Sequence, residues 1–218
     1  MIKKYIALVF AGSFIMVNPA YAAEKPKTFA SISIALKTLK IEPEDRSGYV
    51  RTKFTHWVNS DGNKLGCDAR KEAIIRDAVT KPKVDKGCVL TGGTWVSAYD
   101  NITIDKASDL DVDHMVPLAE AWDSGASAWT PEKRKQYAND LSDSRHLLSV
   151  SANSNRSKSD QDPTDWVPTY KPYVCTYLAN WVSIKIRWSL SIDAKEFDSI
   201  NKASASCPKK SISIVPIG

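Results

Sequence analysis

The 218-residue chain contains little glycine and proline, 9 and 11 residues respectively. This scarcity excludes a collagen-like or low-complexity protein. Hydrophobic residues make up 43% of the chain and charged residues 25%, which excludes disorder driven by charge. Because the sequence contains neither an internal repeat nor a domain-sized linker, we expect one globular domain.

A long hydrophobic run is missing as well, apart from a short one near the N-terminus. Lys3 and Lys4 precede an apolar stretch at residues 5–17, and small residues follow at 20–23. This order is typical of a secretory signal peptide with its cleavage site, and the run is too short to cross a bilayer. We therefore predict a signal peptide at residues 1–23 and a mature domain at 24–218 that is secreted or periplasmic.

Another apolar stretch, residues 173–190, carries Lys185 and Arg187 in its middle. We expect a buried or amphipathic helix there, and no membrane segment after signal cleavage. The predicted signal peptide contains two of the 30 basic residues and none of the 25 acidic ones, so the mature chain would carry a net charge of +3. A surplus this small is compatible with a polyanionic substrate but does not indicate one.

Cysteine is limited to four residues, Cys67, Cys88, Cys175 and Cys207, and their spacing does not favour a zinc or redox site. An even number of cysteines in an exported chain favours two disulfides. Three pairings are open. The pairing of Cys67 with Cys88 and of Cys175 with Cys207 closes the shortest loops, and it is the one that we prefer.

Hydrophobic periodicity and turn residues predict an α+β fold, with helices around a small antiparallel sheet. The expected strands are short and lie within residues 87–104, 109–117 and 147–150. The expected helices lie at residues 28–40, 68–78, 118–122, 151–158, 172–190 and 193–204, with another that starts at Thr130-Pro131.

Histidine, the usual general base near neutral pH, is scarce: it occurs only at positions 56, 114 and 146. His114 stands out because it directly follows Asp113 in the acidic segment 109–117. This segment has the alternating pattern of a strand, which Pro117 ends.

One alternative for this segment is a calcium-binding loop. Asp109, Asp111, Asp113 and Glu120 occupy positions 1, 3, 5 and 12 of an EF-hand. However, His114 stands at position 6, where such a loop needs glycine for its sharp turn, and the residues before it have the pattern of a strand instead of a helix. We therefore disfavour this alternative.

A nuclease site explains the segment better. Phosphodiester hydrolysis needs a base that deprotonates water, a divalent cation that neutralises charge on the phosphate, and cationic groups that hold the backbone. Asp113 and His114 offer a metal ligand and a base in adjacent positions. A second polar set follows downstream, from His146 to Asp160.

Together the two segments resemble the HNH endonuclease, or ββα-metal, motif. The first part is Asp113-His114-Met115-Val116-Pro117, and the second is Asn155-Arg156-Ser157-Lys158-Ser159-Asp160, at the start of a polar helix that follows a strand. A wider likeness, over most of residues 45–207, is to secreted bacterial HNH proteins related to the C-terminal domain of GmrSD-type restriction enzymes. The resemblance implies a ββα-metal core within about residues 109–160.

The resemblance also implies roles for individual residues. His114 would be the general base, and Asp113 and Asn155 would hold one divalent metal ion. One carboxylate and one amide leave most of the coordination sphere to water and phosphate, which suits Mg²⁺ best, with Mn²⁺, Ca²⁺ or Zn²⁺ as alternatives. His146 aligns where the motif normally has an asparagine that braces the loop of the base, so its catalytic role is open between a brace and a metal ligand.

Three basic residues, Arg156, Lys158 and Arg145, are candidates for contact with backbone phosphates, with a solvated surface as the alternative for each. Since the sequence contains no base-reading module such as a zinc finger, we expect low sequence specificity. The expected partner is nucleic acid, DNA or else RNA, and the protein is expected to be a monomer.

Two functions without catalysis stay open: a secreted nucleic-acid-binding domain and a calcium-stabilised structural domain. Trp166 is expected in the core, and stacking on an unpaired base is its alternative.

Overall fold

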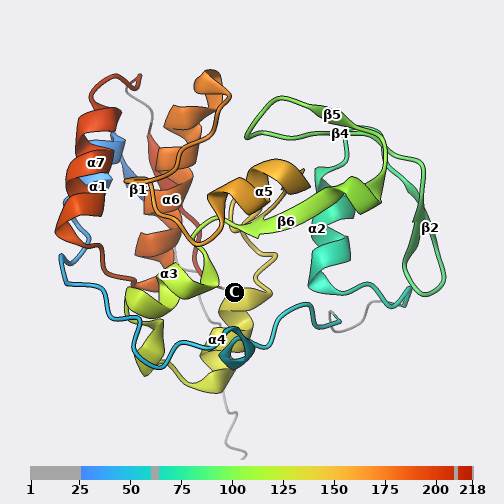
Figure 1. The fold of residues 1–218 in the computed structure, drawn as a ribbon, viewed down its shortest axis with the longest axis horizontal. Coiled ribbons are helices and arrows are strands. Elements are labelled where there is room, and N and C mark those ends of the chain that lie inside the picture. The colour runs from blue at the N-terminus through green and yellow to red at the C-terminus, as the bar shows by residue number, and fades with distance from the viewer. Residues whose placement is uncertain (1–25, 60–63, 209–210, 218) are drawn as a thin grey trace, which may run out of the picture.

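The computed structural model describes residues 26–59, 64–208 and 211–217, so the predicted signal peptide lies outside the described residues. Within them, helices and short strands alternate (Figure 1). The helices are α1 (Ile32–Leu36), α2 (Ala69–Asp77), α3 (Leu118–Asp123), α4 (Pro131–Ala138), α5 (Ala152–Lys158), α6 (Val174–Trp188) and α7 (Ala194–Ser204). The strands are β1 (Lys27–Phe29), β2 (Lys83–Asp85), β3 (Val89–Thr91), β4 (Trp95–Val96), β5 (Thr103–Ile104), β6 (Leu110–His114), β7 (Leu147–Ser151) and β8 (Ile212–Ile214).

The strands form antiparallel pairs: β1 with β8, β2 with β3, β4 with β5, and β6 with β7. The β6–β7 pair has the longest register, from Leu110 opposite Ser151 to His114 opposite Leu147. The α+β class is therefore confirmed. In the described residues, separate two-stranded pairs replace the single small sheet that we expected, because most of these strands are only two or three residues long and helices pack between the pairs.

The expected helix at residues 28–40 is wrong in its first part. Phe29 pairs with Ile212 and belongs to strand β1, and Ser31 then caps the short helix α1 through its side chain. A long-range strand pairing has overridden the local helical periodicity.

Most helix starts follow their sequence signals. Asp68 accepts a hydrogen bond from the main-chain nitrogen of Lys71 at the start of α2, and Thr130 caps α4, with proline in the first turn. Ser151 has a double role, since it ends β7 and caps α5. The chain therefore passes from strand to helix without an intervening loop.

Two hydrophobic clusters lie on either side of the β6–β7 hairpin. The larger one surrounds α6 and contains Trp181 and Trp166, so the core position expected for Trp166 is confirmed. The smaller one lies between α2 and the hairpin and includes Leu110 and Leu147. Figure 1 shows α1, α6 and α7 on one side of the molecule and α2 with β2, β4 and β5 on the other. The β6–β7 pair is thus packed between the two clusters.

Charges in the middle of α6 are explained by burial among partners. The Lys185 ammonium donates to Glu120 on α3 at 2.7 Å and to Glu196 on α7 at 2.5 Å, and its side chain is fully buried. No helix within residues 26–59, 64–208 and 211–217 is long and apolar enough to cross a membrane.

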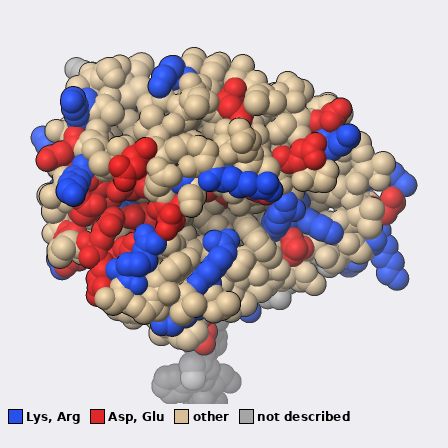
Figure 2. Space-filling model, in the orientation of Figure 1, with Lys and Arg blue, Asp and Glu red and all other residues tan. Residues whose placement is uncertain are grey.

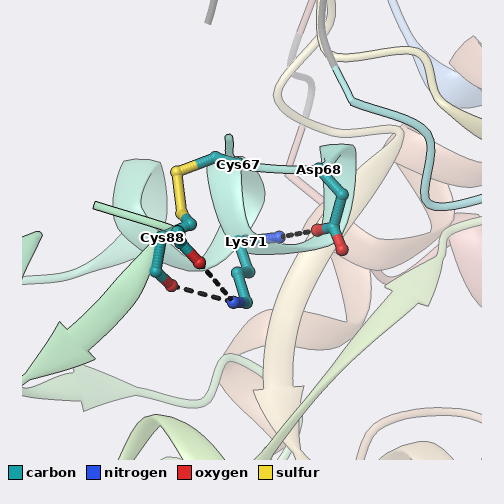
Figure 3. Close-up of a disulfide and its surroundings, with 5 residues drawn as sticks. Cys67, Asp68, Lys71 and Cys88 are labelled. Atoms are coloured by element: carbon teal, nitrogen blue, oxygen red, sulfur yellow. Dashed lines mark hydrogen bonds between the residues drawn. A yellow bond between two sulfur atoms is a disulfide. The ribbon is translucent and has the colours of Figure 1, made fainter. Parts of the chain in front are cut away.

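Both preferred disulfides are confirmed, Cys67–Cys88 and Cys175–Cys207. The first links the start of α2 to the turn between β2 and β3, where the Lys71 ammonium donates to the carbonyl oxygen of Cys88 at 2.8 Å (Figure 3). The second ties the start of α6 to the residues that follow α7.

Candidate active site

Strand β6 and helix α5 contribute residues to the lining of one pocket of about 480 Å³. Asp113 and His114 stand at the end of β6, and α5 contributes Asn155 and Arg156 from its second turn. The pocket is also lined by Tyr49, Arg51, Val112, Pro117, Leu118, Ala119, Ser159 and Asp160. The two halves of the sequence motif, which begin 42 positions apart at Asp113 and Asn155, therefore meet at one place, as a ββα arrangement requires.

The His114 ring is held by a main-chain contact. Its Nε2 atom lies 3.0 Å from the carbonyl oxygen of Ala138, at the end of α4. A carbonyl can only accept, so Nε2 carries the proton and Nδ1 carries the lone pair in the neutral ring. Burial lowers the pKa of His114 well below its usual value, and the nearby His146 and Arg51 act in the same direction. The ring is thus a neutral base at neutral pH.

Asp113 is 5% exposed and both of its carboxylate oxygens have partners. The Lys158 ammonium donates to Oδ1 at 2.8 Å, and the Tyr99 hydroxyl donates to Oδ2. Burial raises the pKa of Asp113, while the charge of Lys158 and these hydrogen bonds oppose that shift. Each carboxylate oxygen has two lone pairs, so the group still has acceptor capacity for a further partner.

The expected contact of Lys158 with a backbone phosphate does not fit the structure. The Lys158 side chain is fully buried and also donates to the main-chain oxygen of His114 at 3.0 Å. Lys158 follows Asn155 by three residues, so both side chains lie on the face of α5 that packs on β6, where Asn155 contacts Asp111 and Lys158 contacts Asp113. An ammonium in that position cannot meet a phosphate at the surface.

Asn155 and Arg156 have different surroundings. The Asn155 Nδ2 atom donates to Asp111 at 3.3 Å, which leaves its Oδ1 oxygen as the acceptor end. The Arg156 side chain is 75% exposed and lies 3.4 Å from the same Asp111 carboxylate. Its guanidinium is therefore accessible to an anion that enters the pocket.

The donor set suits a hard divalent cation. The Asp113 carboxylate and the Asn155 amide oxygen come from two elements that line the same pocket, and oxygen donors of this kind are those that Mg²⁺ prefers. Two other groups of carboxylates could in principle hold an ion, and both contain Glu44. These are the groups found among the described residues. Of their buried members, Glu120 and Glu196 are bound to Lys185 and Asp123 to Arg46, and none of the residues in these groups lines the pocket.

His146 is fully buried beside this pocket and does not line it. Its Nε2 atom lies 2.7 Å from the carbonyl oxygen of Tyr137, which directly precedes the Ala138 carbonyl used by His114. Its own main-chain oxygen accepts from the nitrogen of Met115 at 2.9 Å. Such contacts are those of a brace between α4, the start of β7 and Met115, the residue after His114.

Arg145 lies outside the pocket lining. Its guanidinium binds both carboxylate oxygens of Asp143 and also donates to the hydroxyl of Ser183 at 3.1 Å. These partners already engage three of its donor groups. Its predicted contact with a backbone phosphate stays a prediction, and Arg145 is not among the residues that line the pocket with Asp113, His114 and Asn155.

Two pocket residues escaped the sequence analysis, Tyr49 and Arg51. They lie in the segment before α2, which has no hydrophobic periodicity and no motif, so only the tertiary fold could reveal them. The calcium-loop alternative is wrong, because Asp111 and Asp113 lie in strand β6 instead of a loop and Glu120 is bound to Lys185.

Comparison with known proteins agrees with the geometry. The sequence profile described as the C-terminal domain of GmrSD restriction endonucleases matches residues 67–202, more than half of the chain. A protein of Arthroderma benhamiae described as an uncharacterized secreted protein is 37% identical over 209 residues, which cover 94% of this chain and 100% of the relative. No solved structure matches the chain.

Proposed function

Because the chain belongs to the family of GmrSD restriction endonuclease C-terminal domains, we propose that it is a secreted HNH-type endonuclease. Its substrate is DNA, with RNA as the alternative, and it hydrolyses phosphodiester bonds with low sequence specificity. The observation that carries this proposal is the convergence of His114, Asp113 and Asn155 on one pocket. The relative described as secreted and the predicted signal peptide support export.

In this proposal His114 is the general base. The hydrogen bond from Nε2 to Ala138 orients the ring and keeps the lone pair on Nδ1, which takes the proton from the attacking water. The lowered pKa of His114 keeps the base unprotonated at neutral pH. When the proton arrives, the Ala138 carbonyl favours the charged ring, because it accepts from Nε2.

Asp113 and Asn155 would hold the divalent cation, most simply Mg²⁺. The bound ion supplies Lewis-acid stabilisation of the charge that builds on the phosphate and the leaving oxygen. Neighbouring side chains orient the two ligands. Lys158 and Tyr99 hold the Asp113 carboxylate by hydrogen bonds, and the hydrogen bond from Asn155 to Asp111 orients the Asn155 amide.

The pocket walls supply cations for the nucleic acid backbone. Arg156 comes from α5 and Arg51 from the segment before α2, so the phosphate would be held from two sides. Figure 2 shows Lys and Arg side chains across the middle of the face in view and both signs of charge on its right, while Asp and Glu gather on its left. A polyanion is therefore favoured along the middle of this face and repelled from its left.

A plasmid-nicking assay with and without EDTA tests the proposal, with His114→Ala as the active-site variant. His56→Ala is the matched control, because His56 does not line the pocket. Nicking that requires metal and His114 supports the proposal. Binding of DNA without nicking in any divalent metal would instead identify a binding domain, and metal-dependent stability without binding would identify a structural domain.

A further inference from the structure

Lys158 has an unusual place for a lysine beside a cation site. Its side chain is fully buried, with 0% of its surface exposed. Its ammonium lies 2.8 Å from Asp113 Oδ1 and 3.0 Å from the His114 carbonyl oxygen. Lysine is almost never fully buried unless it is paired. The structure therefore contains a fixed positive charge against the carboxylate that would bind the metal.

The charges of this cluster balance without a metal. Asp113 carries one negative charge, Lys158 one positive charge, and Asn155 none. The next carboxylate, Asp111, is shared between the Asn155 amide and the Arg156 guanidinium. A divalent cation on Asp113 would therefore enter a group of residues whose negative charges are already matched by positive ones.

The ammonium has little freedom to move away. It is enclosed by Asp113, the His114 main chain and the ring of Trp181, whose centre lies 5.8 Å from Nζ. An exposed lysine would swing into water when a cation arrives, whereas this one must stay close to it. Because screening by solvent is weak at a buried position, the repulsion persists in the metal-bound state.

We propose that Lys158 keeps the metal affinity of the free protein low, so that the divalent cation is retained together with a phosphate of the nucleic acid. The phosphate brings the negative charge that Lys158 cancels. Metal and nucleic acid then bind cooperatively, and each raises the affinity for the other by the same factor. This inference rests on the proposed function, since it takes Asp113 as the metal ligand and a phosphodiester as the substrate.

A competing explanation gives Lys158 a positioning role. On that account the ammonium only orients the Asp113 carboxylate, and its loss weakens metal binding, as loss of such partners commonly does, by about 10–100-fold. The two explanations predict opposite signs for the same substitution. Tyr99 provides the matched control, because its hydroxyl contacts the other oxygen of the same carboxylate without carrying a charge.

Mn²⁺ binding measured by calorimetry tests the proposal without reference to activity. The titrations use the His114→Ala protein, in which cleavage is expected to be about 10²–10⁴-fold slower, with and without a short DNA duplex. A titration of the duplex alone corrects for Mn²⁺ bound by DNA. We expect the duplex to tighten Mn²⁺ binding at least about tenfold. Adding Lys158→Met should tighten Mn²⁺ binding in the absence of DNA by about tenfold or more. It should also reduce the factor by which the duplex tightens Mn²⁺ binding. Tyr99→Phe should not tighten it.

Equal or weaker Mn²⁺ binding in folded Lys158→Met would overturn the proposal in favour of the positioning role. If circular dichroism shows that Lys158→Met does not fold, the test uses two proteins that keep the positive charge, His114→Ala alone and His114→Ala with Lys158→Arg. A Mn²⁺ affinity that the duplex leaves unchanged in both proteins would overturn the proposal. Failure of the proposed function would look different, because plasmid nicking would then be absent or insensitive to EDTA.

Discussion

The Nε2 atom of His114 lies 3.0 Å from the carbonyl oxygen of Ala138, the last residue of α4. Carbonyls in the last turn of a helix lack partners within the helix and carry the negative end of its dipole. The preceding carbonyl, of Tyr137, accepts from His146 in the same way. The end of one helix thus orients both buried histidines, and in the proposed mechanism it leaves Nδ1 of His114 as the nitrogen that would act as the base.

Replacing His114 by alanine is expected to lower the cleavage rate by about 10²–10⁴-fold, the usual contribution of a positioned base. Binding of metal and DNA should persist, because Asp113, Asn155 and the arginines are unchanged. Single-turnover cleavage and equilibrium DNA binding measure the two effects separately. Turnover within a few-fold of the unmodified protein would remove His114 from catalysis.

The two buried histidines should make a contribution to stability that decreases in mild acid, because both resist protonation. Burial lowers the pKa of His114 and of His146 in the folded state, so the unfolded chain binds more protons below the usual histidine pKa of about 6.5. Their contribution is complete above that pH and is lost as the pH falls towards the lowered values. The two together set a slope of up to about 2.7 kcal/mol per pH unit.

Urea denaturation at pH 7.5, 6.5 and 5.5 measures this slope, and His146→Asn provides the comparison. The variant has one histidine fewer in the core, so the slope of its free energy of unfolding against pH should be smaller by up to about 1.4 kcal/mol per pH unit in this range. An identical slope in the two proteins would show that other groups govern the acid sensitivity.

Much of the site could be predicted from local sequence signals. Asp113 and His114 end an alternating strand, and Ser151 marks the start of the helix that presents Asn155, so strand, cap and helix follow each other as the sequence indicates. The motif also predicts that these segments meet, although it does not by itself specify which side chains are buried.

The remaining parts of the site depend on tertiary contacts. Lys158 has the sequence context of a solvated helix face, and only the position of β6 against α5 makes it a buried partner of Asp113. Arg51 comes from a segment without periodic pattern, and it reaches the pocket because the core holds that segment against the site. Phe29 likewise leaves its expected helix through pairing with Ile212, 183 residues away in the chain.

The two arginines of the pocket should each contact phosphate. Removing either charge, in Arg51→Ala or Arg156→Ala, is expected to weaken DNA binding and to reduce the slope of log K against log salt by about one. Lys195→Ala is the control, because this exposed lysine on α7 does not line the pocket. Fluorescence anisotropy across a salt series measures the slopes. An unchanged slope in Arg51→Ala would leave that wall of the pocket without a role in binding.

The disulfides should stabilise the fold without taking part in the reaction. They link residues 21 and 32 positions apart, and loop-closure entropy then gives about 3–4 kcal/mol for each. A Cys67→Ala, Cys88→Ala double variant should lose stability of this order and keep its cleavage rate at a temperature where it is folded, because the bond lies between α2 and the β2–β3 turn. Denaturation and nicking assays check both parts, and four reactive thiols in the native protein would contradict the premise.

His146 gives the last test, because a brace and a metal ligand respond differently to substitution. Its Nε2 atom is engaged with the Tyr137 carbonyl, and its main-chain oxygen holds the nitrogen of Met115, next to the base. An asparagine amide can donate a similar hydrogen bond, so His146→Asn should retain substantial cleavage, whereas His146→Ala should lose more. The Mg²⁺ concentration at half-maximal cleavage should be unchanged in His146→Asn, since the oxygen donors of Asp113 and Asn155 are intact. A midpoint shifted by about an order of magnitude or more would make His146 a ligand, and it would turn the site towards a transition metal, for which imidazole is the better donor.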